Sequence, residues 1–180
     1  YQADLERESH LPSETKDGVE HNLMTNIELL EEGVAANNYG AIDIGLFRTE
    51  FFYMDLKRYP TEDELHQHYT ELVELMSPQS VTIRTLDING DKVNPYLTAV
   101  EEANPALGLR AVRFCIENED VFITQLKAIF RAAAFGSIKL LIPMISCVEE
   151  SCRLNRLSTR QFLSLNMRTG YSIKIFRWES

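Results

Sequence analysis

The stretch that decides the fold is residues 81–92, Val-Thr-Ile-Arg-Thr-Leu-Asp-Ile-Asn-Gly-Asp-Lys. A β-branched run, which favours a strand, carries Arg84 to its end and then breaks into an Asp/Asn/Gly turn. Residues 41–52 repeat this pattern, because an apolar run there leads into Arg48, a threonine and an acid. Parallel α/β enzymes build ligand sites from side chains at the carboxyl ends of their strands. The two segments therefore predict two guanidinium groups that face one anionic ligand.

Strands and helices alternate around these two segments. We expect strands at 19–27, 41–47, 81–86 and 138–145, and helices at 28–38, 61–77, 107–116, 121–135 and from 146 onward. Strands that are apolar throughout, separated by helices, indicate a parallel sheet that is buried on both faces. This order fits about half of a (β/α) barrel, or a small doubly wound sheet.

The helix that begins near Thr61 has the clearest signals. Thr61 is a good N-cap, and Glu64 stands three positions later, as in a capping box. Pro78 ends the pattern. Apolar residues recur at steps of three and four along one face: Leu65, Tyr69, Leu72, Val73 and Met76.

Composition excludes several classes of function. With 180 residues, of which 44% are hydrophobic, the chain can form one domain with a substantial core. A net charge of −9 argues against a nucleic-acid partner, and no apolar run reaches the roughly 18 residues of a membrane span. The three cysteines lack ligand-type spacing and indicate reduced thiols in a cytoplasmic protein.

Three segments differ in character. We expect residues 1–18 to be a polar leader from a preceding linker, residues 19–150 to be a partial barrel, and residues 151–180 to be an atypical basic tail. The net charge divides into −14 before residue 151 and +5 after it. The tail has no clean helical or strand period, so a frameshifted or degraded gene end is one explanation and a genuine basic extension is the other. The chain does not begin with Met, so we also expect it to be a fragment.

Arg48 and Arg84 are the first candidates for chemistry. A pair of guanidinium forks can hold a phosphate or carboxylate in bidentate fashion, which lysine does less well. The alternative is that each arginine pairs with a neighbouring acid, such as Glu50 or Asp87, and only stiffens the rim of the barrel.

Arg110 is the third candidate, because it lies just inside the helix expected at 107–116. Near a helix N-terminus it would extend an anion site, and a solvated surface arginine is the alternative. Asp87, Asp91 and Lys92 could orient the arginines or bind a cation, although an ordinary turn with a local ion pair explains them as well. No histidine lies in a pattern that activates a nucleophile.

Four motifs carry a resemblance to a known family: residues 45–54 (Gly-Leu-Phe-Arg-Thr-Glu-Phe-Phe-Tyr-Met), 82–92, 102–113 (Glu-Ala-Asn-Pro-Ala-Leu-Gly-Leu-Arg-Ala-Val-Arg) and 143–145 (Pro-Met-Ile). In this order and spacing they resemble the phosphoenolpyruvate-binding barrel of enzyme I of the bacterial phosphotransferase system, over about residues 19–150. The resemblance implies a TIM-type barrel, of which this chain would hold roughly the first four strands of eight.

The resemblance also implies a function. Such an enzyme takes the phosphoryl group of phosphoenolpyruvate onto a histidine of a separate domain and passes it to the carrier protein HPr. By resemblance, Arg48 and Arg84 would bind the substrate's phosphate and carboxylate, with Arg110 beside them. The family uses Mg²⁺, forms homodimers through the barrel, and is cytoplasmic. Its sugar and nitrogen-regulatory branches both fit.

The sequence departs from the family in informative places. Asn89 replaces a glycine, and Glu28-Leu29 replaces the usual Gly-Thr after the first strand. The family's histidine domain would precede residue 1, and its magnesium ligands and acid cysteine would follow residue 150, where none is found. By this resemblance we therefore predict one wall of a substrate site, with no catalytic residue and no metal ligand in this chain. The alternatives are a non-catalytic remnant, a dimerisation module, or part of a pyruvate phosphate dikinase-like enzyme.

Overall fold

The computed structural model describes residues 9, 11–56, 58–88 and 108–169, with only the backbone of 165–169. One sheet of parallel strands runs through this part of the chain, in the order β1-β2-β3-β4. The strands are Met24–Ile27 (β1), Asp43–Phe47 (β2), Val81–Arg84 (β3) and Ile138–Leu141 (β4). The helices are Leu30–Asn38 (α2), Glu50–Asp55 (α3), Glu62–Met76 (α4), Ala111–Glu117 (α5), Glu119–Ala132 (α6) and Val148–Thr169 (α7).

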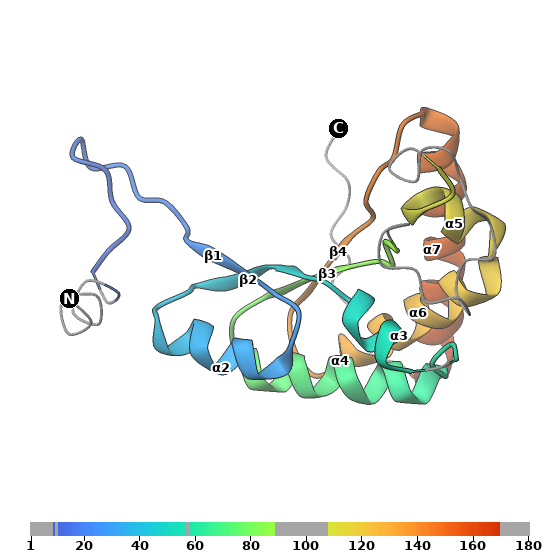
Figure 1. Cartoon of the computed structure of the whole chain (residues 1–180), viewed down its shortest axis with the longest axis horizontal. Helices are drawn as coiled ribbons and strands as arrows, with labels where there is room; N and C mark the ends of the chain where they lie inside the picture. The colour runs from blue at the N-terminus through green and yellow to red at the C-terminus, as the bar shows by residue number, and fades with distance from the viewer. Residues whose placement is uncertain (1–8, 10, 57, 89–107, 170–180) are drawn as a thin grey trace.

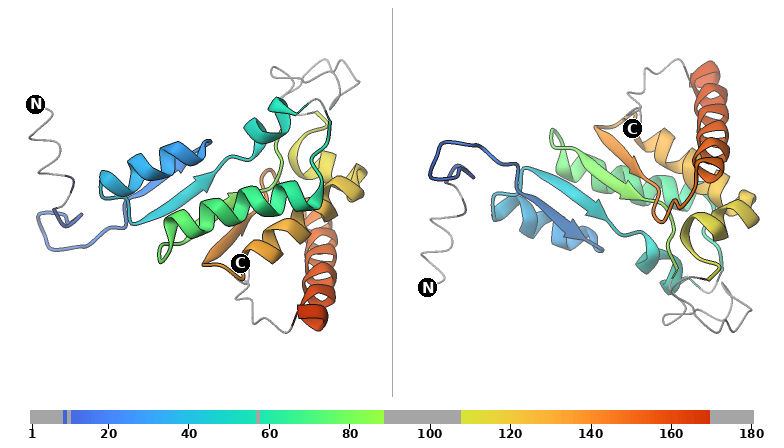
Figure 2. Two further views of the ribbon diagram at one scale, coloured as in Figure 1. Left: turned by 90° about the horizontal axis from the view of Figure 1, so that it is seen from below. Right: turned by 90° about the horizontal axis from the view of Figure 1, so that it is seen from above.

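Each strand is followed by at least one helix, and neighbouring strands in the sheet follow one another along the chain. The helices α2, α4 and α6 cover one face of the sheet (Figure 1). They lie in front of the strands in the left view of Figure 2, and the strands lie in front of them in the right view. This is the progression of one half of a (β/α) barrel. The prediction of an α/β fold with four parallel strands is confirmed.

Helix α4 forms as its sequence predicts. The Thr61 hydroxyl accepts a hydrogen bond from the backbone N–H of Glu64 at 3.3 Å, and the Glu64 carboxylate accepts one from the Thr61 N–H at 2.8 Å. This reciprocal pair is the expected capping box. All five residues of the predicted apolar stripe are buried, and the helix packs against α6.

The strands are less completely buried than their apolar sequences suggest. In β3, Val81 and Ile83 are buried against the helices, while Thr82 and Arg84 on the other face are only half-buried. All four residues of β4 are half-buried, because β4 is an edge strand of the described sheet. The expectation of strands buried on both faces is therefore wrong for this part of the chain, whose described helices cover one face.

Two helices differ from expectation. The short α3 was not predicted, and α7 continues without a break across residue 150 to Thr169. The prediction that no helical period follows Glu150 is wrong for residues 151–169. Leu154 is buried, Leu157 and Phe162 pack against the same core, and the Phe162 ring meets Phe130 of α6 at a centroid distance of 5.9 Å. Apolar packing thus explains the helix, while the basic side chains remain exposed.

Strands β1 and β2 approach closely at Gly45. A Cβ atom there would lie 2.9 Å from the Cβ of Met24, so any larger residue would push the strands apart. The register shifts between Thr25 and Asn26, and beyond this irregularity Ile27 pairs with Phe47 at the carboxyl ends of the two strands. Within the part of the chain that the structure describes, no helix has both the length and the apolar character needed to cross a bilayer.

Candidate anion-binding site

A pocket of about 190 Å³ lies at the carboxyl ends of the first three strands. This volume is well below the 300–1,000 Å³ of pockets for drug-sized ligands, so it suits a small molecule. All three arginines predicted from the sequence line it, together with three carboxylates and two apolar side chains. The lining residues are Glu28, Arg48, Glu50, Phe51, Met54, Arg84, Asp87 and Arg110.

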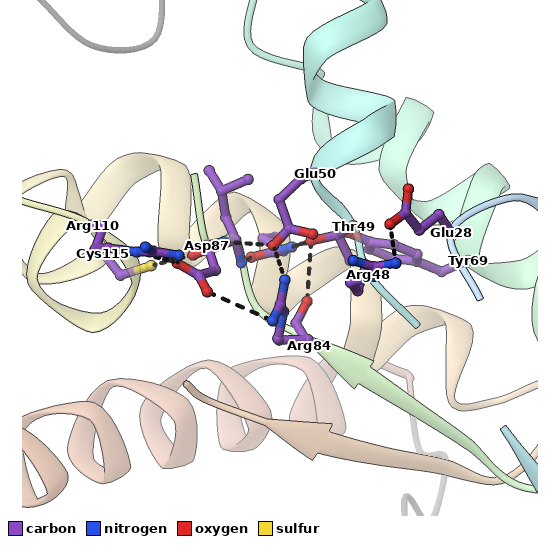
Figure 3. A network of polar contacts seen from close by, with 11 residues as sticks. Glu28, Arg48, Thr49, Glu50, Tyr69, Arg84, Asp87, Arg110 and Cys115 are labelled. Atoms are coloured by element: carbon purple, nitrogen blue, oxygen red, sulfur yellow. Dashed lines mark hydrogen bonds and ion pairs between the residues drawn. The ribbon is translucent and has the colours of Figure 1, made fainter. Parts of the chain in front are cut away.

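Arg84 is the last residue of β3 and stands at the centre of this group (Figure 3). Its Nη2 atom lies 3.0 Å from Oε1 of Glu50, the first residue of α3. Its Nη1 atom lies 3.6 Å from Oδ2 of Asp87. The Arg84 side chain is 19% exposed and Asp87 only 7%, so these charges are largely removed from solvent.

Arg110 reaches the same Asp87 from the other side. Its Nε and Nη2 atoms each lie 2.9 Å from Oδ1 of Asp87. The prediction that Arg110 lies inside a helix is wrong, because α5 begins at Ala111 and Arg110 has an extended backbone as its N-cap. Ala111 adopts a φ of 46°, a left-handed conformation that is strained for alanine and turns the chain sharply after Arg110.

Backbone groups join these side chains into one network. The Asp87 N–H donates to Oε1 of Glu50 at 2.9 Å, and the Thr49 hydroxyl donates to the carbonyl of Arg84 at 3.1 Å. We call Glu50, Arg84, Asp87 and Arg110 the buried cluster. Its arginines come from β3 and the segment before α5, and its carboxylates hold their guanidinium groups at the pocket wall.

Arg48 follows β2 and forms an ion pair with Glu28, which follows β1. We call these two residues the exposed pair, since the Arg48 side chain is 44% exposed and that of Glu28 is 31% exposed. In Figure 3 they lie on the opposite side of Arg84 from Arg110. The pocket therefore has a buried end and a more open end.

Gln125 supports the buried cluster from below and was missed by the sequence analysis. Its side-chain carbonyl accepts the N–H of Leu86 at 3.0 Å, and its amide donates to the Thr49 hydroxyl at 3.3 Å and the Tyr69 hydroxyl at 3.1 Å. The residue is fully buried. The sequence could have indicated this role, because Gln125 is an amide on the otherwise apolar face of α6, and a buried amide needs hydrogen-bond partners.

Cys115 lies beside the buried cluster and is unreactive in this setting. Burial, and secondarily the charge of Asp87, raise the pKa of the Cys115 thiol to about 12. A thiol that stays protonated is a poor nucleophile. Cys115 is thus a buried core residue, whereas Cys147 is exposed.

The alternative interpretation, in which each arginine pairs with a neighbouring acid, holds in part. Arg84 does pair with Glu50 and Asp87, the two acids that the sequence analysis named. Arg48 pairs instead with Glu28, which the sequence analysis did not name as its partner. Asp87 orients two arginines, while Asp91 and Lys92 lie outside the described residues. Ion pairing and ligand binding are compatible, because carboxylates that hold guanidinium groups in place also pre-organise them.

The carboxylates that line the pocket do not fit a magnesium site. Each of them, Glu28, Glu50 and Asp87, is paired with a guanidinium group. Across the described residues, no group of three or more histidine, cysteine, aspartate or glutamate side chains could hold a metal ion. Mg²⁺ prefers several oxygen ligands in octahedral geometry, which this arrangement does not offer.

Parallel strands with a pocket lined by arginines at their carboxyl ends define a (β/α) unit, and comparison with known proteins identifies its family. The sequence profile of the PEP-binding domain of PEP-utilising enzymes matches residues 2–176. The chain belongs to this family.

Individual relatives agree with this assignment. The chain is 46% identical over 151 residues to a phosphoenolpyruvate-protein phosphotransferase of Listeria innocua, which covers 83% of this chain and 26% of the relative. It is 44% identical over 139 residues to the protein of that name from Bacillus subtilis, and this alignment covers 77% of this chain and 24% of the relative. A multiphosphoryl transfer protein of Rhodobacter capsulatus is 42% identical over 150 residues, an alignment that covers 83% of this chain and 18% of the relative. The chain thus spans about a quarter or less of the length of these relatives.

Proposed function

We propose that the pocket binds phosphoenolpyruvate as part of an enzyme that transfers its phosphoryl group to a protein histidine. The observation that carries this proposal is the presence of three guanidinium groups, from Arg48, Arg84 and Arg110, around one pocket of about 190 Å³. Family membership supports the ligand, and the names of the relatives support transfer to a protein.

The chemistry of the ligand matches the pocket. Phosphoenolpyruvate carries a phosphate and a carboxylate on three carbons, so it needs cationic groups at two ends of a small site. Phosphoryl transfer depends mainly on positioning and on neutralising charge, with little covalent help from the protein. Arg84 and Arg110, held by Asp87, supply fixed cations at the buried end. Arg48 supplies a third at the open end.

Further features of the whole enzyme follow as proposals. HPr would be the protein that receives the phosphoryl group, through a histidine domain outside this chain, and the barrel would form a homodimer in the cytoplasm. Residues 19–150 would be the barrel portion, and the segment from residue 151, which begins inside α7, would differ from it by its basic charge. Magnesium would be held by residues other than the paired carboxylates of this pocket, so the described residues act on the substrate through their guanidinium groups.

Calorimetric titration of phosphoenolpyruvate into the 180-residue chain tests the ligand. We expect a dissociation constant in the millimolar range, or about −4 kcal/mol, because the guanidinium groups act without a metal. Binding should weaken as salt rises and should not change when magnesium is added.

Variants distinguish the pocket from general charge. Arg84→Ala should weaken binding about tenfold or more, and Arg84→Lys should be intermediate because lysine keeps the charge but loses the fork. Arg160→Ala is the control, since Arg160 is exposed on α7 and does not line the pocket. If Arg84→Ala and Arg160→Ala, both folded by circular dichroism, bind phosphoenolpyruvate equally well, the pocket is not the site.

A further inference from the structure

The position of Glu28 beside Arg48 is set by the backbone on both sides. Strands β1 and β2 are parallel, and Ile27 pairs with Phe47, so the residues that follow leave the sheet next to each other. The Arg48 N–H donates to the carbonyl of Ile27 at 2.9 Å. The Glu28 N–H donates to the carboxylate of Glu32 in α2 at 2.7 Å. The pair therefore results from sheet register and is not a chance contact of two long surface side chains.

The carboxylate of Glu28 also lies where a ligand would have to bind. Glu28 and Arg48 both line the pocket. Their side chains are 31% and 44% exposed, whereas those of Arg84 and Arg110 are only 19% and 15% exposed. A guanidinium group that is paired with a carboxylate has fewer donors left for a second anion. An anion at the open end must therefore compete with Glu28.

The other two carboxylates of the pocket have structural roles that Glu28 does not share. Glu50 accepts the backbone N–H of Asp87 as well as Arg84, and Asp87 holds both Arg84 and Arg110. Displacing either of them would disrupt the pocket wall. Glu28 contacts Arg48 at the open end, where solvent can hydrate a released carboxylate at small cost.

We propose that the Glu28 carboxylate is a built-in competitor that occupies the anion position of Arg48 and must move away before a ligand phosphate or carboxylate can bind there. This inference rests on the proposed function, and it makes Glu28 a residue that sets affinity. One ion pair replaces another, and no covalent bond changes. Substrate binding at Arg84 and Arg110 precedes or accompanies release of Glu28 from Arg48.

Titration of phosphoenolpyruvate into Glu28→Gln tests the proposal, because glutamine keeps the size of the side chain and removes its charge. An exposed ion pair is weak, so we expect binding to become about two- to fivefold tighter, which is at most about 1 kcal/mol. Glu31→Gln is the matched control, because it removes the same charge from the exposed first turn of α2 without altering the pocket lining. In the Arg48→Ala background, Glu28→Gln should give a clearly smaller gain.

A second measurement reports on Arg48 directly. Phenylglyoxal modifies accessible guanidinium groups, and peptide mass mapping gives the rate at each arginine. Arg48 should react faster in Glu28→Gln than in the unaltered chain, while Arg84 should not change. Tighter binding together with faster modification at Arg48 supports the proposal.

The outcomes separate this inference from the proposed function. If the unaltered chain binds phosphoenolpyruvate in an Arg84-dependent manner but Glu28→Gln binds no tighter than Glu31→Gln, the inference is overturned and the proposed function stands. If neither the unaltered chain nor Glu28→Gln binds phosphoenolpyruvate, both are overturned.

Discussion

At the end of β3, Arg84 is held by Glu50 and Asp87 with little access to solvent, whereas at the end of β2, Arg48 meets Glu28 at the open edge of the same pocket. Both arginines arise from the same sequence pattern, a strand that ends in Arg-Thr and then an acid. The buried cluster and the exposed pair therefore differ in surroundings and not in local sequence.

This difference indicates a division of labour. Charges in the buried cluster are hard to unpair, because neither partner can be fully hydrated without opening the structure. Charges in the exposed pair can separate and rejoin at small cost. The buried cluster can thus hold one end of an anionic ligand rigidly, while the exposed pair provides a cation that can exchange its partner.

The largest expected effect is that of Asp87→Ala on stability. Removing this carboxylate leaves Arg84 and Arg110 largely buried without their shared partner, so the free energy of unfolding should fall by about 3–5 kcal/mol. Urea denaturation followed by circular dichroism measures the change. A loss below about 1 kcal/mol would show that the buried cluster is as loosely coupled as the exposed pair.

The support beneath the buried cluster should come next. Gln125→Leu removes hydrogen bonds to Leu86, Thr49 and Tyr69 and leaves their polar groups buried, which should cost about 1–3 kcal/mol of unfolding free energy. Gln67→Leu is a matched control on exposed α4 surface and should change stability by about 0.5 kcal/mol or less. Equal effects of the two changes would contradict a supporting role for Gln125.

His68 offers a test that lies outside both arginine groups. Its ring stacks on Phe52 at a centroid distance of 4.3 Å, and burial lowers the pKa of His68 below its usual 6.5. Below pH 6.5 the unfolded chain takes up a proton that the folded chain resists, so stability should fall as the pH drops from about 7. His68→Phe should flatten this dependence in urea denaturation at a series of pH values. A slope that does not change would assign the effect to other groups, including His66, whose pKa burial also lowers.

The smallest expected effect is that of the exposed pair on stability. Glu28→Ala and Arg48→Ala should each change the free energy of unfolding by less than about 1 kcal/mol, since solvent screens both charges. Arg48→Ala should nevertheless weaken phosphoenolpyruvate binding in the calorimetric titration. If Arg48→Ala destabilised the fold as much as Asp87→Ala does, the distinction between the two regions would fail.

Much of the fold could be predicted from local patterns. The capping box of Thr61 and Glu64 and the apolar stripe of α4 depend on neighbours within one or two turns, so sequence spacing determines them. The positions of Arg48 and Arg84 at strand ends follow from where apolar runs stop, and parallel strands bring those ends to one edge.

Only the tertiary structure decided which charges meet. Glu28 faces Arg48 because Ile27 aligns with Phe47 across two strands. Gln125 contacts Leu86, 39 positions away in the chain, because α6 lies next to the segment that follows β3. The helical course of α7 beyond residue 150 likewise depends on a partner surface, which Leu154 and Phe162 find on α6. Such contacts depend on register and packing between distant segments, which local sequence spacing does not encode.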